Sequence, residues 1–176
     1  MRIELERVSK RYQNEWVLKN VELRLEENGR YAVTGPNGSG KSTLLKILSA
    51  HLTPSRGKVR HLIKGELLDV NDVYRYISYG APYIDLIEEL TLTEAITFHR
   101  QFKPFLEKLD TKAVIDLLGF ERAGNKQIRY FSSGMKQRLK LVLAICSGSE
   151  LLLVCEPAAN LDRHVVEWYL QLLERF

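Results

Sequence analysis

The feature that most constrains this chain is a glycine-rich segment placed between a short apolar run and a helical run. Residues 31–43 read Tyr-Ala-Val-Thr-Gly-Pro-Asn-Gly-Ser-Gly-Lys-Ser-Thr, and the largely apolar stretch 44–48 follows. The pattern predicts a strand, a tight turn and a helix, and its spacing is that of a phosphate-binding loop. Glycines let backbone N–H groups surround a phosphate, and the helix N-terminus adds a positive end. We predict that Lys41 approaches the β- and γ-phosphates of a nucleotide and that the Ser42 hydroxyl ligates Mg2+. The predicted loop comprises Gly35, Pro36, Asn37, Gly38, Ser39, Gly40, Lys41, Ser42 and Thr43.

The segments around this loop predict an α/β fold with an antiparallel edge. Residues 2–8 and 17–25 alternate apolar and polar side chains, which indicates two strands of an antiparallel sheet. Tyr12 lies in the polar turn between them, where an aromatic ring is able to stack on a nucleotide base, although a plain loop residue fits the position equally well. Further strands are predicted over 58–63 and 73–79.

From about residue 85 onward the apolar residues follow a helical period. Two helices separated by Pro104 are predicted between 85 and 120, and we interpret 85–132 as a helical insertion inside the α/β core. Ser132 or Ser133 suits the N-cap of a further helix, and an N-cap with free N–H groups is also an anion site. The alternative reading is simply a capped helix.

The apolar run 151–154 is typical of a strand buried on both faces of a parallel sheet. Glu156 follows its carboxyl end, the edge where open α/β sheets bind their ligands. In a chain with a phosphate loop, this carboxylate suits the general base for attack of water on a γ-phosphate, and a surface residue is the alternative. The final segment, 162–176, predicts an amphipathic helix capped by Asp162.

Composition narrows the class of protein. The chain has 176 residues, 45% of them hydrophobic, which is enough for one domain with a real core. No apolar run is long enough to span a bilayer and no signal-peptide core follows the N-terminus, so we expect a cytoplasmic protein. Cys146 and Cys155 have neither disulfide-framework nor zinc-site spacing. The net charge is +4, but the 26 basic residues are scattered among 22 acidic ones, so we expect a mixed solvated surface and no nucleic-acid partner.

Taken in order, these motifs resemble the ATP-binding subunit of ABC transporters over nearly the whole chain. By this resemblance Tyr12 matches the aromatic residue that stacks on adenine, and residues 35–43 match the Walker A loop. Residues 131–135 match the family signature, with Ser132 and Gly134 retained. Glu156 matches the catalytic glutamate after Walker B, and residues 160–162 match the D-loop, which ends at Asp162.

The resemblance implies a fold, cofactors and partners. The fold is α/β, a P-loop NTPase core with an antiparallel β edge subdomain and an inserted α-helical subdomain. It forms one domain over 1–176, with its core in 1–84 and 133–176 and the insertion at about 85–132. The cofactors are ATP and Mg2+, with Lys41 and Glu156 as the catalytic residues. Two such subunits, identical or different, face head to tail, so that Ser132 and Gly134 of one act on the ATP of the other. The dimer then drives a transmembrane permease from the inner face of the membrane, where it is peripheral.

Three departures from the family pattern affect this expectation. Cys155 stands where Walker B has an aspartate, and a thiol is a poor replacement in a Mg2+ site because Mg2+ prefers oxygen. Pro82 stands where the family has the Q-loop glutamine. The family's switch histidine lies some thirty residues beyond the glutamate, whereas only 20 residues (176 minus 156) follow Glu156, so we expect a chain truncated before that histidine.

Three functions stay open on these grounds. The first is the ATPase subunit of a membrane transporter, with activity impaired by Cys155 and by the missing histidine. The second is a nucleotide-dependent regulatory module that dimerises on ATP without hydrolysis. The third is a soluble relative acting in DNA repair or on ribosomes, against which we count the lack of a tandem domain, a coiled-coil insertion and a basic arm.

Overall fold

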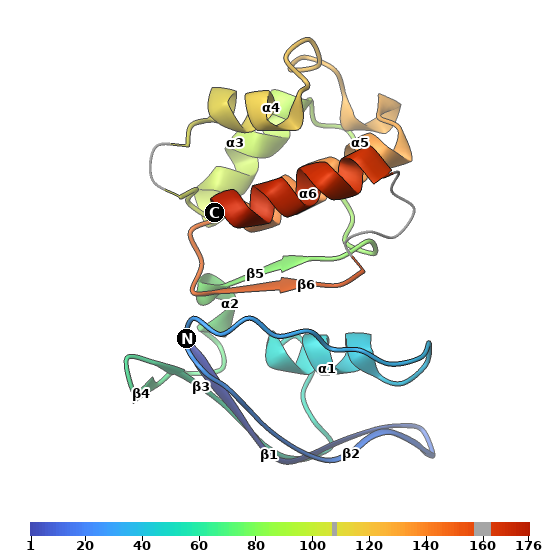
Figure 1. The fold of residues 1–176 in the computed structure, drawn as a ribbon, viewed down its shortest axis with the longest axis vertical. Coiled ribbons are helices and arrows are strands. Elements are labelled where there is room, and N and C mark those ends of the chain that lie inside the picture. The colour runs from blue at the N-terminus through green and yellow to red at the C-terminus, as the bar shows by residue number, and fades with distance from the viewer. Residues whose placement is uncertain (107–108, 157–162) are drawn as a thin grey trace. The chain divides into compact units, whose positions relative to one another are not determined.

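The computed structural model describes residues 1–106, 109–156 and 163–176, with the side chain of residue 163 left aside (Figure 1). The chain divides into two compact units, 1–77 and 78–176, and each is described by itself. In the ranges described, no helix is both long and apolar enough to cross a membrane.

An antiparallel sheet forms the first unit. Its strands are β1 (Arg2–Tyr12), β2 (Glu15–Leu25), β3 (Arg56–Ile63) and β4 (Glu66–Leu67), in the order β2-β1-β3-β4. The alternating pattern predicted the first two strands, and both are confirmed, each extending closer to the turn than predicted. They do so because the connection is only two residues long, with Gln13 in the left-handed region at φ 50°. Ile3, Leu5 and Val8 of β1 are buried, so this strand contributes apolar side chains to the core of the unit.

Residues 31–34, predicted as a strand, are irregular in the structure, and that prediction is wrong. Tyr31 instead folds back on the preceding turn: its hydroxyl accepts a hydrogen bond from the Glu26 backbone N–H at 2.9 Å, and its ring covers Gly29. A strand needs a partner for its backbone groups, and none of the described strands pairs with this segment. The helix predicted after the loop is confirmed as α1 (Lys41–Leu48).

The strand predicted over 73–79 is wrong in its first half. The chain forms the short helix α2 (Val73–Tyr76) and only then β5 (Ile77–Gly80). Asp72 N–H bonds to the Asp69 carbonyl at 2.9 Å and Arg75 N–H bonds to the Asp72 carbonyl at 3.0 Å, which winds the backbone as a helical turn. These local bonds override the β preference of the valine and tyrosine side chains.

Helices dominate the second unit (Figure 1). They are α3 (Leu92–Phe102), α4 (Thr111–Leu118), the 3-10 turn η1 (Ile128–Tyr130), α5 (Ser133–Ile145) and α6 (Arg163–Arg175). The two helices predicted on either side of Pro104 are confirmed as α3 and α4. Each begins at a side-chain cap, Thr91 for α3 and Asp110 for α4, so the local sequence fixes where each starts. The helices share one apolar core with α5, in which Leu139 and Val142 are fully buried.

A two-stranded sheet, β5 with β6 (Leu151–Val154), accompanies these helices, and the two strands run in the same direction in Figure 1. The strand predicted over 151–154 is therefore confirmed. Its expected burial on both faces is not, because only Leu153 is buried and its three neighbours are half-buried. A sheet of two strands leaves part of each strand uncovered, whereas a central strand of a wide parallel sheet is covered on both faces.

Candidate functional site

The glycine-rich loop leads into α1 through glycines with a left-handed backbone conformation. Gly38 and Gly40 have φ of 80° and 91°, a region that residues with a Cβ rarely adopt. A Cβ on Gly38 would meet no atom within 4 Å, so the backbone conformation rather than crowding requires glycine there. Gly40 occupies the N-cap of α1 and makes no side-chain cap hydrogen bond, so the positive end of the helix faces this turn.

Lys41 folds back over this turn. Its Nζ donates hydrogen bonds to the carbonyls of Gly35 and Pro36, at 2.9 Å each. The ammonium group is thereby held above the loop at the positive end of α1. The lysine charge, the helix dipole and the glycine turn together make this segment suited to a polyphosphate.

Both ends of α1 are anchored within the first unit. At the start, a Cβ on Gly40 would meet the side chains of Val17 and Leu18 at 3.0 Å, so β2 lies directly against the helix start. At the other end, Nε2 of His61 donates a hydrogen bond of 2.7 Å to the Leu48 carbonyl. Burial lowers the pKa of His61, which keeps the ring neutral. Sequence reasoning missed this residue because nothing in the local pattern links residue 61 to the helix.

Tyr12 ends β1 in the same unit as the loop. The residue is 45% exposed, and the Lys10 ammonium lies 5.4 Å from the centre of its ring. An exposed aromatic face at the end of a strand is available for stacking.

The signature residues open α5 in the second unit. Ser132 is its N-cap, as predicted, and the Ser132 hydroxyl accepts a hydrogen bond from Met135 N–H at 3.2 Å. Phe131 is buried edge-on against Phe120, which fixes the turn while Ser132 stays exposed. A Cβ on Gly134 would meet nothing closer than 4.0 Å, so packing does not require glycine there and the helix start is open to close approach.

Glu156 follows β6 and is exposed, with φ of 48° in the left-handed region. Cys155, just before it, is buried and is fixed to the neighbouring strand by a 2.8 Å bond from its N–H to the Gly80 carbonyl. A non-glycine residue held left-handed is uncommon and is frequent at functional sites, since the surrounding structure must impose it.

Two tyrosines that sequence reasoning missed lie beside Cys155. The hydroxyls of Tyr79 and Tyr83 are hydrogen-bonded to each other, and the Tyr83 phenol also hydrogen-bonds the Cys155 thiol. Burial raises the pKa of both phenols, so both stay neutral at physiological pH. The sequence signal available for this pair was two tyrosines four residues apart, Tyr79 at the end of a predicted strand and Tyr83 just after it.

The remaining predicted positions are placed as follows. Pro82, at the Q-loop position, offers its carbonyl to the Lys140 ammonium at 2.6 Å. Asp162 and the rest of the D-loop lie outside the described residues. Tyr12 and the loop belong to the first unit, whereas Ser132, Gly134 and Glu156 belong to the second. Within the described part of the chain, no three histidine, cysteine or carboxylate side chains gather as a metal site.

A glycine turn with a lysine folded across it at the start of a helix, in an α/β chain, defines a nucleotide-binding domain of the P-loop class. The chain belongs to the ABC transporter family, whose sequence profile matches residues 18–159.

Comparison with individual proteins agrees with this family. The uncharacterized ABC transporter ATP-binding protein YcbN of Bacillus subtilis is 30% identical over 155 residues, which cover 88% of this chain and 50% of that protein. A solved structure described as the ATP binding subunit of an ABC transporter has a TM-score of 0.84 at 26% identity, covering 99% of this chain and 74% of that one. A dimeric cassette in a post-hydrolysis state, bound to ADP and Pi, has a TM-score of 0.77 at 26% identity, covering 98% and 82%. The chain spans about half the length of the first curated relatives that it matches.

Proposed function

We propose that this chain binds ATP through residues 35–43, hydrolyses it with Glu156 as the general base, and energises a membrane permease as one half of an ATPase dimer. The observation that carries the proposal is Lys41 folded over a left-handed glycine turn at the start of α1. Membership in the ABC transporter family, and a similar dimeric cassette bound to ADP and Pi, support the nucleotide and the dimer.

Each site residue then has a role. The loop N–H groups and Lys41 bind the β- and γ-phosphates, and Tyr12 stacks on the adenine. Glu156 accepts a proton from the attacking water. Ser132 and Gly134 contact the γ-phosphate held by the facing subunit, where the N-terminus of α5 stabilises negative charge. Asp162 belongs to the contact between the subunits.

The residues fit Mg2+ only in part. Ser42, at the start of α1, supplies a hydroxyl oxygen of the kind that Mg2+ accepts, and the bound ion would neutralise phosphate charge there. The end of β6 supplies a thiol that is already hydrogen-bonded to Tyr83, in place of a carboxylate. Losing a unit negative charge about 5 Å from a divalent ion, at an effective dielectric of about 20, removes roughly 7 kcal/mol of attraction before compensation by other groups. If about 3 kcal/mol of that loss remains in the transition state, turnover drops about a hundredfold.

A second function is suggested by the cluster of Cys155, Tyr79 and Tyr83, which places a thiol and two phenols where a carboxylate is expected. A chain that holds ATP firmly and hydrolyses it slowly acts as a nucleotide-dependent regulatory module of the same fold. The two readings share ATP binding and differ in turnover.

The partner and the location are part of the proposal. We infer a transmembrane permease as the partner and a position at the inner, cytoplasmic face of the membrane. We also retain residues 85–132 as the inserted helical subdomain of a single ATPase domain. Crosslinking of intact cells, followed by identification of proteins attached to α3 and to residues 83–90, tests the partner; attachment only to soluble proteins contradicts it.

ATP binding and steady-state hydrolysis, with and without Mg2+, test the activity on the native chain and on two variants. Cys155→Asp restores the carboxylate, and Cys155→Ser is the matched control that changes the thiol without adding charge. We expect all three to bind ATP and Cys155→Asp alone to gain turnover. Binding without hydrolysis in all three supports the regulatory module, and absence of ATP binding by the native chain refutes the proposal.

A further inference from the structure

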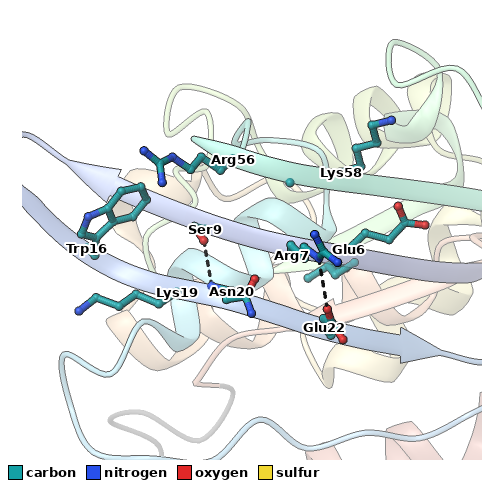
Figure 2. A pocket seen from close by; sticks show the side chains of 11 residues that line it. Glu6, Arg7, Ser9, Trp16, Lys19, Asn20, Glu22, Arg56 and Lys58 are labelled. Carbon is teal, nitrogen blue, oxygen red and sulfur yellow. Dashed lines mark hydrogen bonds and ion pairs between the residues drawn. The ribbon is translucent and has the colours of Figure 1, made fainter.

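A basic hollow in the antiparallel sheet of the first unit has no role in the proposed activity. It has a volume of about 1070 Å³ and is lined by residues of β1, β2 and β3, among them Trp16, Lys19, Arg56 and Lys58 (Figure 2). We propose that this hollow binds a compact multivalent oxyanion, the diphosphate group of a small soluble phosphate, independently of the glycine-rich loop.

The hollow arises from a bend that crosses three strands. Arg7 of β1, Asn20 of β2 and Gly57 of β3 all have positive φ, at 48°, 48° and 86°. The β1–β2 and β1–β3 pairings both shift register in this region. The Ser9 hydroxyl accepts a hydrogen bond from Asn20 N–H at 2.8 Å, which satisfies a backbone group that the shift removes from the ladder. Bulges on adjacent strands bend and twist a sheet, and here they form a recess with a polar rim.

Each acidic side chain of this recess has a cationic neighbour. Glu6 pairs with Arg60 at 2.6 Å, and Glu22 lies 4.0 Å from Arg7. Lys19, Arg56 and Lys58 form no ion pair with any carboxylate in the described ranges. Arg56 and Lys19 lie at one end of the recess and Lys58 at the other (Figure 2), and their unmatched positive charge favours binding of a negatively charged group.

Trp16 orients the cations at one end of the recess. The guanidinium groups of Arg56 and Arg11 lie 5.1 Å and 5.5 Å from the indole. Figure 2 shows Arg56 and Lys19 at the same end of the recess as Trp16. A guanidinium stacked by its face keeps its N–H edge for hydrogen bonds, which is the geometry that phosphate oxygens need. The indole thus restricts the Arg56 side chain before any ligand arrives, so less entropy is lost on binding.

The recess lies open to solvent, because most of its lining residues are exposed and only Leu5 and Ser9 are buried. An anionic membrane surface is therefore the competing ligand, and the test below includes it. Single-stranded nucleic acid needs an open aromatic face for base stacking. On Trp16 the guanidinium groups of Arg11 and Arg56 already lie over the ring.

The test uses Trp16 as an internal reporter. The chain has two tryptophans, so Trp168→Phe leaves Trp16 as the sole tryptophan emitter when only indole is excited. Adding Lys41→Ala weakens phosphate binding at the glycine-rich loop, and titration with inorganic pyrophosphate then reports on the recess. We expect saturable quenching of Trp16, with an affinity that falls as salt rises. Circular dichroism of each variant verifies folding.

Two further variants in that background give the matched comparison. Arg56→Gln is expected to weaken pyrophosphate binding about tenfold, equivalent to about 1.4 kcal/mol. Lys64→Gln removes the same charge from the β3–β4 turn, outside the recess, and is expected to change affinity less than twofold. The proposal is overturned if pyrophosphate leaves Trp16 emission unchanged or if Lys64→Gln weakens binding as much as Arg56→Gln. It is also overturned if vesicles containing phosphatidylglycerol shift the emission when pyrophosphate does not.

Discussion

Replacing Gly57 by alanine should destabilise the first unit by more than the conformational cost of a left-handed alanine. Gly57 has φ of 86°, and a Cβ there would lie 2.4 Å from the Arg7 carbonyl oxygen. Real Cβ atoms essentially never come closer than 3.0 Å, so β1 and β3 must separate locally by at least 0.6 Å, the difference of the two distances. The left-handed conformation costs an L-residue about 1–2 kcal/mol and the crowding about 1–3 kcal/mol more. We expect a total loss of about 2–5 kcal/mol.

Gly65 provides the matched control within the same sheet. Its φ is 85°, nearly that of Gly57, but a Cβ there would meet no atom within 4 Å. Gly65→Ala therefore carries the conformational cost alone, about 1–2 kcal/mol. The difference between the two variants isolates the close approach of β1 and β3.

Urea unfolding followed by Trp16 fluorescence in the Trp168→Phe chain measures both variants, because Trp16 reports on the first unit. With a slope of about 1–3 kcal/mol per molar urea, the Gly57→Ala midpoint should lie about 1 M below that of Gly65→Ala. Equal midpoints would refute the reasoning, since they would mean that the strands do not approach each other at the bulge.

Three other predictions concern the scaffold. His61 has a lowered pKa in the fold, so its contribution to stability is complete above pH 6.5 and is lost as the pH falls below that value. In His61→Gln the unfolding free energy should therefore depend less steeply on pH in this range. An unchanged slope contradicts this prediction. Thr91→Ala removes one half of the capping box with Glu94 and should cost about 1 kcal/mol by thermal unfolding, whereas Thr97→Ala on the exposed face of α3 should be neutral. Leu139→Ala should cost about 2–5 kcal/mol by chemical denaturation, because the side chain is fully buried, and a smaller loss would mean that the core closes over the gap.

Local patterns predicted most of the regular elements. Alternation located β1 and β2, and helical spacing located α3 and α4, because in each case one face of the element packs on a core. The strand predictions for residues 31–34 and 73–76 were wrong for the opposite reason. Their residue types suit a strand, but strands depend on partners distant in sequence, and here turn hydrogen bonds decided the backbone instead.

The same difference between local and distant contacts decides which features of the candidate site could be predicted. The glycine-rich loop and the Ser132 cap were visible because their chemistry lies within a few consecutive residues. The contacts of His61 with Leu48 and of Tyr83 with Cys155 were not visible, because they join segments 13 and 72 positions apart (61 minus 48; 155 minus 83). Sequence spacing carries no information on such pairs without knowledge of the fold.

The link from His61 to α1 also makes the imidazole a spectroscopic reporter. The Leu48 carbonyl only accepts, so Nε2 must carry the hydrogen and Nδ1 is left as the basic nitrogen. This fixes one tautomer, whose two nitrogen resonances differ widely in NMR spectra. The glycine-rich loop precedes the start of α1, and the His61 ring contacts Leu48 at the other end of the same helix. A shift of these resonances on adding ATP would therefore report motion of α1 without direct contact between His61 and the nucleotide.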